Sequence, residues 1–158
     1  MKSSLLAIVL FVGPALHAAM AATVSCPDPA AAVQVGACPS EEELKYTFTG
    51  YCSDDARAYK GNTDVCTDYQ RYRALKNVAL WESGDGMFNA YVSCDLPAGA
   101  LARARASAVK VGKQGKMTLL VCSYGEGVSF TYRTRGECRA DGVNDCNANP
   151  AACKASCN

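Results

Sequence analysis

The clearest pattern in the sequence is a β-hairpin, in the run Met117-Thr118-Leu119-Leu120-Val121-Cys122-Ser123-Tyr124-Gly125-Glu126-Gly127-Val128-Ser129-Phe130-Thr131-Tyr132-Arg133-Thr134-Arg135. Its first half is apolar at nearly every position, which is typical of a central strand that is buried on both faces. Its second half alternates apolar and polar residues, which is typical of a strand with one buried face. Glycines on both sides of Glu126 supply the turn. We therefore predict strands over 116–124 and 128–135.

Alternation of the same kind predicts three earlier strands, at 44–51, 87–94 and 104–111. The last competes with a helix, because alanine, leucine and arginine fill 100–106; we favour the strand. Apolar residues at helical spacing predict an amphipathic helix over 64–76. We expect an α+β domain with a small antiparallel sheet of about five strands and one packed helix. The expected core comprises Phe48, Tyr69, Tyr72, Phe88, Val92, Leu119, Val121, Phe130 and Tyr132.

The N-terminal segment 1–21 has the pattern of a cleaved signal peptide. Lys2 precedes an apolar run over 5–16, and Ala19-Met20-Ala21 fits the small-residue cleavage rule. The run is too short to span a bilayer, and no later apolar stretch is long enough. A retained N-terminal anchor and a lipoprotein acylated at Cys26 are the alternatives. We expect a single mature domain over 22–158 that is secreted or periplasmic.

Removal of residues 1–21 takes away His17, the only histidine of the chain. Catalysis by Ser-His-Asp or Cys-His arrangements is then excluded, and so are histidine-ligated metals. The sequence also contains no nucleotide-binding glycine loop and no metal-ligand motif, so we expect no cofactor. The remaining routes to catalysis use carboxylates, lysine or tyrosine. This pattern favours a binding role over an enzyme.

All ten cysteines lie in the mature chain, and an exported protein is expected to pair them into five disulfides. Spacing does not identify the pairs, because ten cysteines allow on the order of a thousand connectivities. Cys52 and Cys66 bracket a short polar loop and are candidates for a local bridge. The absence of a Cys-x-x-Cys motif argues against a disulfide oxidoreductase. The full set is Cys26, Cys38, Cys52, Cys66, Cys94, Cys122, Cys138, Cys146, Cys153 and Cys157.

The C-terminal segment 139–158 is rich in turn residues and poor in large apolar ones. We predict a stapled tail without its own fold, in which Cys138, Cys146, Cys153 and Cys157 pair mostly among themselves. A zinc site made of these four thiolates is the alternative, but their spacing lacks the Cys-x2-Cys pairs typical of zinc sites.

Three features of the sequence resemble an uncharacterised family of short exported bacterial proteins. They are Cys26-Pro27 at the mature N-terminus, Trp81 ahead of a strand with Phe88 and Ala90, and Val121-Cys122-Ser123-Tyr124 in the central strand. The family has no assigned activity to transfer. The resemblance implies a small antiparallel sheet protein with a disulfide between Cys26 and Cys122.

Charge is divided between the two halves of the mature chain. Residues 22–95 carry six basic and eleven acidic side chains, a net charge of −5, whereas residues 96–158 carry nine basic and four acidic ones, a net charge of +5. The basic half offers a surface for anionic lipid, anionic glycan or an acidic protein. The alternative is a solvated hairpin whose lysines protect a sheet edge. No stacking platform is interleaved with the cations, so nucleic acid is not an expected partner. The cations are Arg103, Arg105, Lys110, Lys113 and Lys116.

Several acidic residues are candidates for chemistry, each with a simpler alternative. Glu126 at a hairpin tip is placed to project into a partner's cleft, or it is an ordinary exposed turn residue. Trp81, in a predicted tight turn over 81–86 with Glu82 and Asp85, offers an aromatic ring beside carboxylates for sugar binding or acid–base catalysis. Core packing is the alternative for a lone tryptophan.

The remaining acidic residues fit structural roles better than chemical ones. Asp54, Asp55 and Asp64 lack the spacing of a calcium loop and are interpreted as helix caps. Glu41, Glu42 and Glu43 are interpreted as a solvated acidic turn before the first strand.

The leading hypothesis is a secreted or periplasmic binding protein, an inhibitor or immunity-type partner of a hydrolase or toxin. Rigid hairpin tips held by disulfides would lose little entropy on docking. One alternative is a small exported effector or toxin, acting as a carboxylate-dependent hydrolase on the envelope or a host. Another is a glycan-binding envelope component. The partner is expected to be another protein, with anionic glycan or lipid as further options. The predicted binding residues are Glu126, Lys113, Lys116, Trp81 and Asp85.

Overall fold

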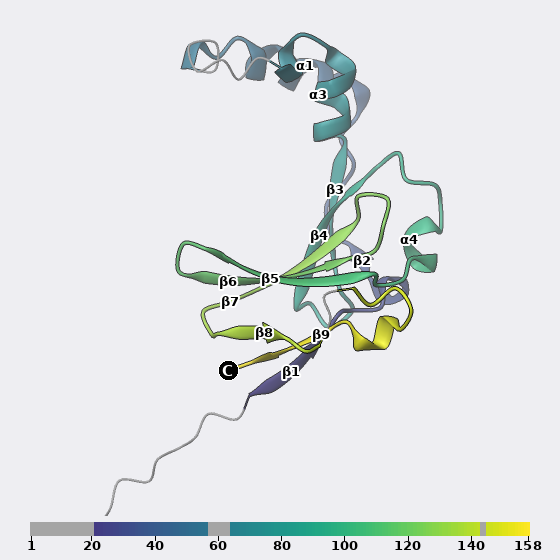
Figure 1. Ribbon diagram of the computed structural model, residues 1–158. Helices are drawn as coiled ribbons and strands as arrows, with labels where there is room; N and C mark the ends of the chain where they lie inside the picture. Colours follow the sequence, from purple (N-terminus) through teal and green to yellow (C-terminus); the bar gives the residue numbers. More distant parts are fainter. Residues whose placement is uncertain (1–20, 57–63, 143–144) are drawn as a thin grey trace, which may run out of the picture.

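A six-stranded antiparallel sheet forms the main layer of the protein (Figure 1). The computed structural model describes residues 21–56, 64–142 and 145–158. The predicted strands 87–94, 116–124 and 128–135 are confirmed, and the α+β class is confirmed with them. In spatial order the strands are β2 (Val33–Gln34), β3 (Val78–Glu82), β4 (Phe88–Ser93), β7 (Ser129–Thr134), β6 (Met117–Ser123) and β5 (Ala108–Gln114).

A second, three-stranded antiparallel sheet lies against one face of the first (Figure 1). Val24 and Ala155 from this small sheet join Phe88, Leu120 and Phe130 from the large one in a single buried cluster. The main core therefore lies between the two sheets. The strands of the small sheet are β1 (Ala22–Ser25), β9 (Lys154–Cys157) and β8 (Cys138–Ala140).

The predicted stapled tail is confirmed by its two disulfides, and segment 139–158 is in addition part of the small sheet. It supplies β9, most of β8 and the short 3-10 turn η3 (Pro150–Ala152). Cys153, Ala155 and Cys157 alternate with exposed or half-buried residues and are all buried. Small side chains at alternate positions are sufficient here, because the large sheet supplies the bulky apolar residues of the shared core.

Two helices, α1 (Glu41–Cys52) and α3 (Tyr69–Lys76), lie at the open end of the β3–β4 hairpin, away from the small sheet (Figure 1). A 3-10 turn, η2 (Asp64–Cys66), precedes α3. The ring of Phe48 lies 5.4 Å from that of Tyr69 and 5.1 Å from that of Tyr72, between centroids, so the two helices share a small aromatic cluster. We call α1, η2 and α3 the head, and the part of β3–β4 that carries them the stalk. The two sheets without the stalk are the body.

The predicted strand over 44–51 is wrong, because these residues belong to α1. Ser40 Oγ accepts a hydrogen bond from the Glu43 N–H at 3.2 Å, and the Glu43 carboxylate accepts one from the Ser40 N–H at 2.7 Å. This capping box starts a helix. Leu44 and Phe48 then lie one turn apart on the side of α1 that packs against α3, whereas Tyr46, two residues after Leu44, is 81% exposed.

Three other element boundaries differ from the prediction. The helix over 64–76 is divided into η2 and α3, and α3 starts after Asp68, whose carboxylate accepts the Gln70 N–H at 2.9 Å. The strand over 104–111 begins only at Ala108, because α4 (Ala100–Arg103) occupies part of the competing helical stretch. The tight turn over 81–86 is shorter, since Trp81 and Glu82 are the last residues of β3.

The predicted core is correct in part. Tyr72, Phe88, Val92 and Phe130 are buried, and Phe48, Tyr69 and Tyr132 are half-buried. Leu119 and Val121 are also only half-buried, because the opposite face of β6, with Leu120 and Cys122, packs into the core. Both faces of β6 are apolar, so alternation alone does not identify the inner one.

All ten cysteines are paired. The Cys26–Cys122 bridge that the resemblance implied joins the N-terminal arm to β6. The local Cys52–Cys66 bridge closes the head, and Cys38–Cys94 joins the segment before α1 to the end of β4. The four tail cysteines pair among themselves as predicted, as Cys138–Cys157 and Cys146–Cys153, in place of the zinc alternative.

Candidate functional site

The face of the large sheet that is turned away from the small sheet carries exposed apolar side chains. Leu80 on β3 pairs with Tyr91 on β4, and both lie opposite the buried Ala79 and Ala90. Tyr91 is 68% exposed, and Val33 on the neighbouring β2 is 57% exposed. Apolar surface that gathers on one face in this way is typical of an interaction site.

The same face continues across β6 with two cations beside its apolar residues. Val121 pairs with Lys110 on β5, and Leu119 pairs with Arg133 on β7. Arg133 donates a hydrogen bond to Asn89 Oδ1 at 2.8 Å, which fixes its guanidinium on this face. We call the set the outer-face site: Val33, Leu80, Tyr91, Lys110, Leu119, Val121 and Arg133.

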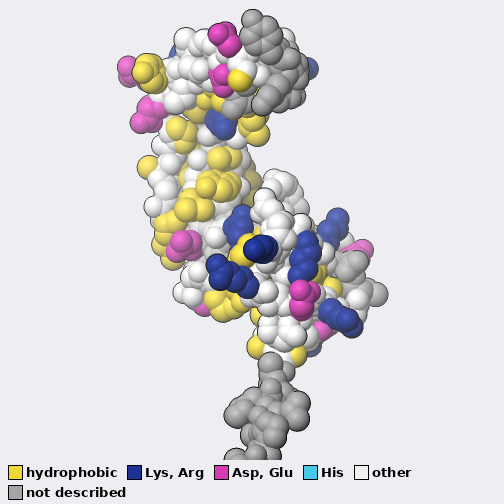
Figure 2. Space-filling model, turned by 90° about the vertical axis from the view of Figure 1, so that its left-hand side faces the viewer, with side chains coloured by type: hydrophobic (Ala, Val, Ile, Leu, Met, Phe, Trp, Pro, Cys, Tyr) yellow, Lys and Arg dark blue, Asp and Glu magenta, His cyan; other side chains and the backbone are white. Residues whose placement is uncertain are grey.

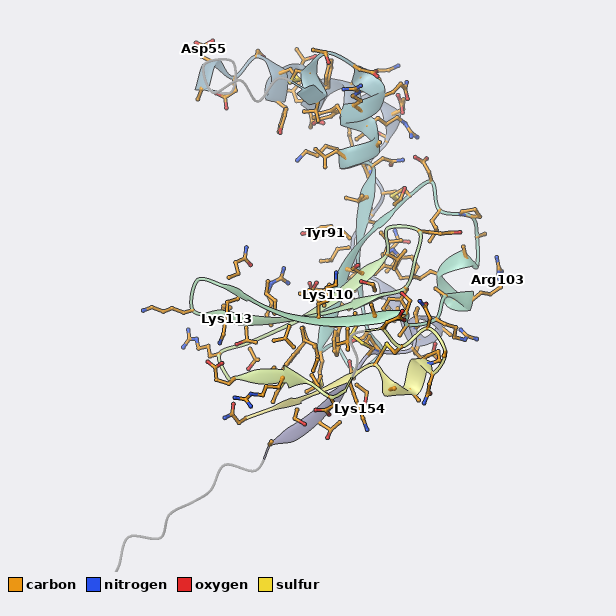
Figure 3. All side chains as sticks on the ribbon, viewed as in Figure 1. Asp55, Tyr91, Arg103, Lys110, Lys113 and Lys154 are labelled. Atoms are coloured by element: carbon orange, nitrogen blue, oxygen red, sulfur yellow. A yellow bond between two sulfur atoms is a disulfide. The ribbon has the colours of Figure 1, made fainter. Side chains whose placement is uncertain are left out.

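The outer-face site spans two parts of the sheet that meet at an angle. β4 pairs with β7 only at Phe88 and Asn89, and beyond them β3 and β4 rise as the stalk (Figure 1). Tyr91 on the stalk lies above Lys110 on β5 in Figure 3. Figure 2 shows this side of the molecule, with apolar side chains along the stalk and a cluster of lysine and arginine side chains on the body below it.

The predicted binding lysines lie at the β5–β6 turn, away from the centre of the outer-face site. Lys113 Nζ donates to Thr118 Oγ1 at 2.8 Å and to the Glu137 carboxylate at 2.7 Å. Since Thr118 is buried on the inner side of β6, Lys113 points toward the small sheet, and its charge is paired. Lys116 is exposed in the turn itself.

Glu126 is not brought together with these lysines. It lies in the β6–β7 turn, and successive turns of an antiparallel meander fall at opposite ends of the sheet. Arg103 on α4 likewise lies on the other side of the molecule from Lys113 (Figure 3). Arg105 donates to the carbonyl oxygen of Ala104 at 2.9 Å. The cations of the basic half therefore form no single patch.

Trp81 and its neighbouring carboxylates do not form a sugar platform. Trp81 is half-buried against the main core, and Glu82, as the next residue of the strand, points to the opposite face. Asp85 Oδ1 accepts hydrogen bonds from the Ser83 hydroxyl at 2.5 Å and from the Met87 N–H at 3.0 Å. These bonds hold the pKa of Asp85 below its usual value, so the carboxylate is ionised at neutral pH and cannot serve as a general acid.

The acidic residues of the head have structural roles. Glu41 accepts hydrogen bonds from the Tyr69 hydroxyl at 2.7 Å and from Arg73 at 3.1 Å, and both lower its pKa. The predicted acidic turn 41–43 is thus the first turn of α1, where carboxylates interact favourably with the positive end of the helix dipole. Asp54 accepts the Ala56 N–H at 2.9 Å, as a cap. No group of three or more metal-ligating side chains gathers among the described residues.

Sequence reasoning missed Tyr91, Leu80 and Arg133 as candidate site residues. A usable signal existed for Tyr91, because the alternation that placed Phe88, Ala90 and Val92 on one face of a strand also placed this large aromatic on the other. No comparable signal existed for Arg133, whose neighbours depend on the order of the strands.

Comparison with family models, with curated proteins and with solved structures finds no match for the chain. No helix in the ranges 21–56, 64–142 and 145–158 is long and apolar enough to cross a membrane. Five disulfides are typical of a protein from an oxidising compartment.

Proposed function

We propose that the protein is an exported binding protein, secreted or periplasmic, that docks on a partner protein through the outer-face site. In this proposal it acts as an inhibitor or immunity-type partner of a hydrolase or toxin. The observation that carries the proposal is the exposure of Tyr91 among apolar neighbours on the outer face of the large sheet. Tyrosine and arginine are over-represented among the residues that dominate protein interfaces.

Strand pairing fixes the backbone beneath the outer-face site, which favours tight binding. Leu80, Tyr91 and Val121 lie on paired strands, so their backbones are fixed before any partner arrives. The Cys26–Cys122 bridge anchors β6 from behind. A surface that is ordered in advance loses little conformational entropy on binding.

The charges of the site indicate the chemistry of the partner. Lys110 and Arg133 form no ion pair among the described residues, although Glu82, which pairs with Val33 and Asn89, lies on the same face. A partner surface with carboxylates around an apolar centre would complement them. We therefore assign the partner an acidic face.

The two alternatives have weaker support. A carboxylate-dependent hydrolase would need Glu82 and Asp85 near each other with one raised pKa, but the pKa of Asp85 is lowered. A glycan site built on Trp81 has weaker support, because that ring is packed against the main core.

Partner capture tests the proposed site. Immobilised protein is exposed to envelope extract and culture medium, and the affinity of the captured partner is measured for each variant. Tyr91→Ala and Lys110→Glu are expected to weaken binding at least about tenfold. Tyr46→Ala removes an equally large and even more exposed tyrosine from the head and is expected to bind like the native protein.

Native affinity in both Tyr91→Ala and Lys110→Glu would refute the outer-face site. Loss of binding in Glu126→Lys and Lys113→Glu instead would move the interface to the hairpin tips. The captured partner is then assayed for hydrolytic or toxic activity with and without the protein. Unchanged activity in the complex would refute the inhibitor role.

A further inference from the structure

A small cavity of about 290 Å³ lies between α4 and the β6–β7 turn, away from the outer-face site. Leu96 and Leu101 line it from the α4 side, and Tyr124 and Val128 from the two sides of the turn. Leu101, Tyr124 and Val128 are themselves buried, so the floor is firm and apolar. Two residues of opposite charge, Arg103 and Glu126, also line this cavity.

Both charged groups are available to a ligand. Neither Arg103 nor Glu126 forms an ion pair or a side-chain hydrogen bond within the described part of the chain. The hydroxyl of Tyr124 is already used, since it donates to the Pro27 carbonyl oxygen at 2.5 Å. The cavity therefore offers one carboxylate and one guanidinium beside an apolar floor.

The backbone of Glu126 has a conformation that is uncommon for a residue with a side chain. Its φ is +48°, in the left-handed region, between Gly125 and Gly127, which also have positive φ. Among the described residues it is the one non-glycine residue with positive φ. A glycine would adopt this conformation without strain, so the turn retains a carboxylate at a cost in stability.

The Arg103 side chain lies beside a glycine at the start of its own helix. Its guanidinium Nη1 lies only 2.9 Å from the point where a Cβ on Gly99 would stand. Gly99, with a φ of +71°, precedes the first residue of α4. The absence of a side chain at Gly99 leaves room for the guanidinium against the start of its own helix.

We propose that this cavity binds a small zwitterion with an apolar side chain, of the class of free α-amino acids. The ligand ammonium group pairs with Glu126, the ligand carboxylate pairs with Arg103, and the apolar side chain lies on Leu101 and Val128. A simple anion or cation would leave one of the two protein charges without a partner. The size of the cavity also suits a ligand of this class, at the small end of the range for ligand pockets.

The ligand series that tests the proposal separates the two charges. L-Leucine, N-acetyl-L-leucine and L-leucinamide are titrated separately into the native protein at neutral pH. Binding is followed by calorimetry and by NMR shifts at Leu101, Tyr124 and Val128. N-acetyl-leucine lacks the ammonium group and leucinamide lacks the carboxylate, so each is expected to bind at least about tenfold more weakly than leucine.

Two variants assign each charge to its protein partner. Arg103→Gln is expected to lose the preference for leucine over leucinamide but to keep the preference over N-acetyl-leucine. Glu126→Gly is expected to lose the preference over N-acetyl-leucine and also to raise the unfolding temperature, because glycine relieves the positive φ. Loss of binding in a more stable protein excludes misfolding as the cause. Arg105→Gln, at an exposed arginine outside the cavity, is the matched control and keeps native binding.

Three results would overturn the proposal. The first is the absence of saturable leucine binding in the native protein, and the second is equal binding of all three compounds. The third is native leucine affinity in Glu126→Gly or Arg103→Gln. Partner capture by the outer-face site does not depend on any of them, so the two proposals fail separately.

Discussion

Arg73 illustrates how charged side chains join the two helices of the head to each other and to the segment that follows β4. Its guanidinium forms two hydrogen bonds with Asp95, at 2.6 and 3.1 Å, and one with Glu41 at 3.1 Å. Asp95 lies 22 residues away in the chain and Glu41 lies 32 residues away. The Arg73 bonds lower the pKa of Asp95, and they raise the pKa of Arg73 itself. A bidentate arginine of this kind fixes geometry as well as charge.

Because charged partners lie far apart in the sequence, the candidate site could be predicted only in part. Sequence reasoning correctly placed Glu126 at an exposed turn and Lys110 on a strand. It did not show that Lys113 forms an ion pair with Glu137, or that Asp85 accepts a hydrogen bond within its own turn. Which charges remain free depends on strand order and helix placement, and neither is encoded in local spacing.

Asp85 provides a prediction at the residue scale. Asp85→Ala removes the acceptor for the Ser83 hydroxyl and the Met87 N–H, and we expect a loss of about 1 kcal/mol in unfolding free energy at pH 7. The folded-state pKa of Asp85 lies below the ordinary value of 3.8. Its ionised form therefore adds stability that is present above the unfolded-state pKa and lost as the pH falls through the folded-state value. Urea unfolding with intact disulfides, at pH 7 and at pH 3, measures both effects.

Asp85→Asn serves as the control, since its amide oxygen still accepts both hydrogen bonds but does not titrate. We expect it to keep most of the stability at pH 7. A difference between native protein and Asp85→Ala that does not shrink between pH 7 and pH 3 would contradict the assigned role of the carboxylate.

Helix α1 shows how two valid local patterns compete at the scale of an element. Leu44, Tyr46 and Phe48 alternate as in a strand, and Leu44 and Phe48 are also spaced as in a helix. The capping box at Ser40 and Glu43 decides between them, because it satisfies the free N–H groups at a helix start. The pattern of a serine followed three residues later by glutamate was readable in the sequence. The docking of α1 on α3, which buries its apolar side, was not.

Strand β9 supports a prediction at the same scale. Ala155 is fully buried between the two sheets, so Ala155→Leu inserts atoms into a packed core. We expect a loss of about 1 to 3 kcal/mol in unfolding free energy. The measurement is denaturant unfolding with all disulfides intact. Ala151→Leu adds the same atoms at an exposed position of η3 and is expected to change stability little. Equal stability of both variants would mean that the C-terminal segment is only a stapled tail.

The whole molecule divides its disulfides between two environments. The head and the adjoining end of the stalk contain Cys52–Cys66 and Cys38–Cys94, whose sulfur-bearing residues are exposed or half-buried. The remaining three bridges each include at least one cysteine buried in the main core. The sequence correctly predicted five bridges and the local ones. The long-range Cys38–Cys94 bridge depends on the stalk, which spacing does not reveal.

This division predicts reduction in two stages. Exchange with a thiol reagent requires access to a sulfur, so the bridges of the head and stalk should open first under native conditions. Each opened bridge yields two thiols, so alkylation should add about four labels after the first stage and about ten after denaturation and full reduction. Intact mass spectrometry after rapid alkylation counts the labels at both stages, and peptide mapping locates the labelled cysteines.

A variant without the head bridge, Cys52→Ser with Cys66→Ser, isolates the contribution of the head. Its first stage should add only about two labels, from Cys38–Cys94, and the three body bridges should open at the native rate. That result is expected because the body core, with Phe88, Leu120 and Phe130, makes no use of the head for its packing. If the body bridges opened earlier in this variant, or together with the exposed ones in the native protein, the head would be part of one cooperative unit with the body.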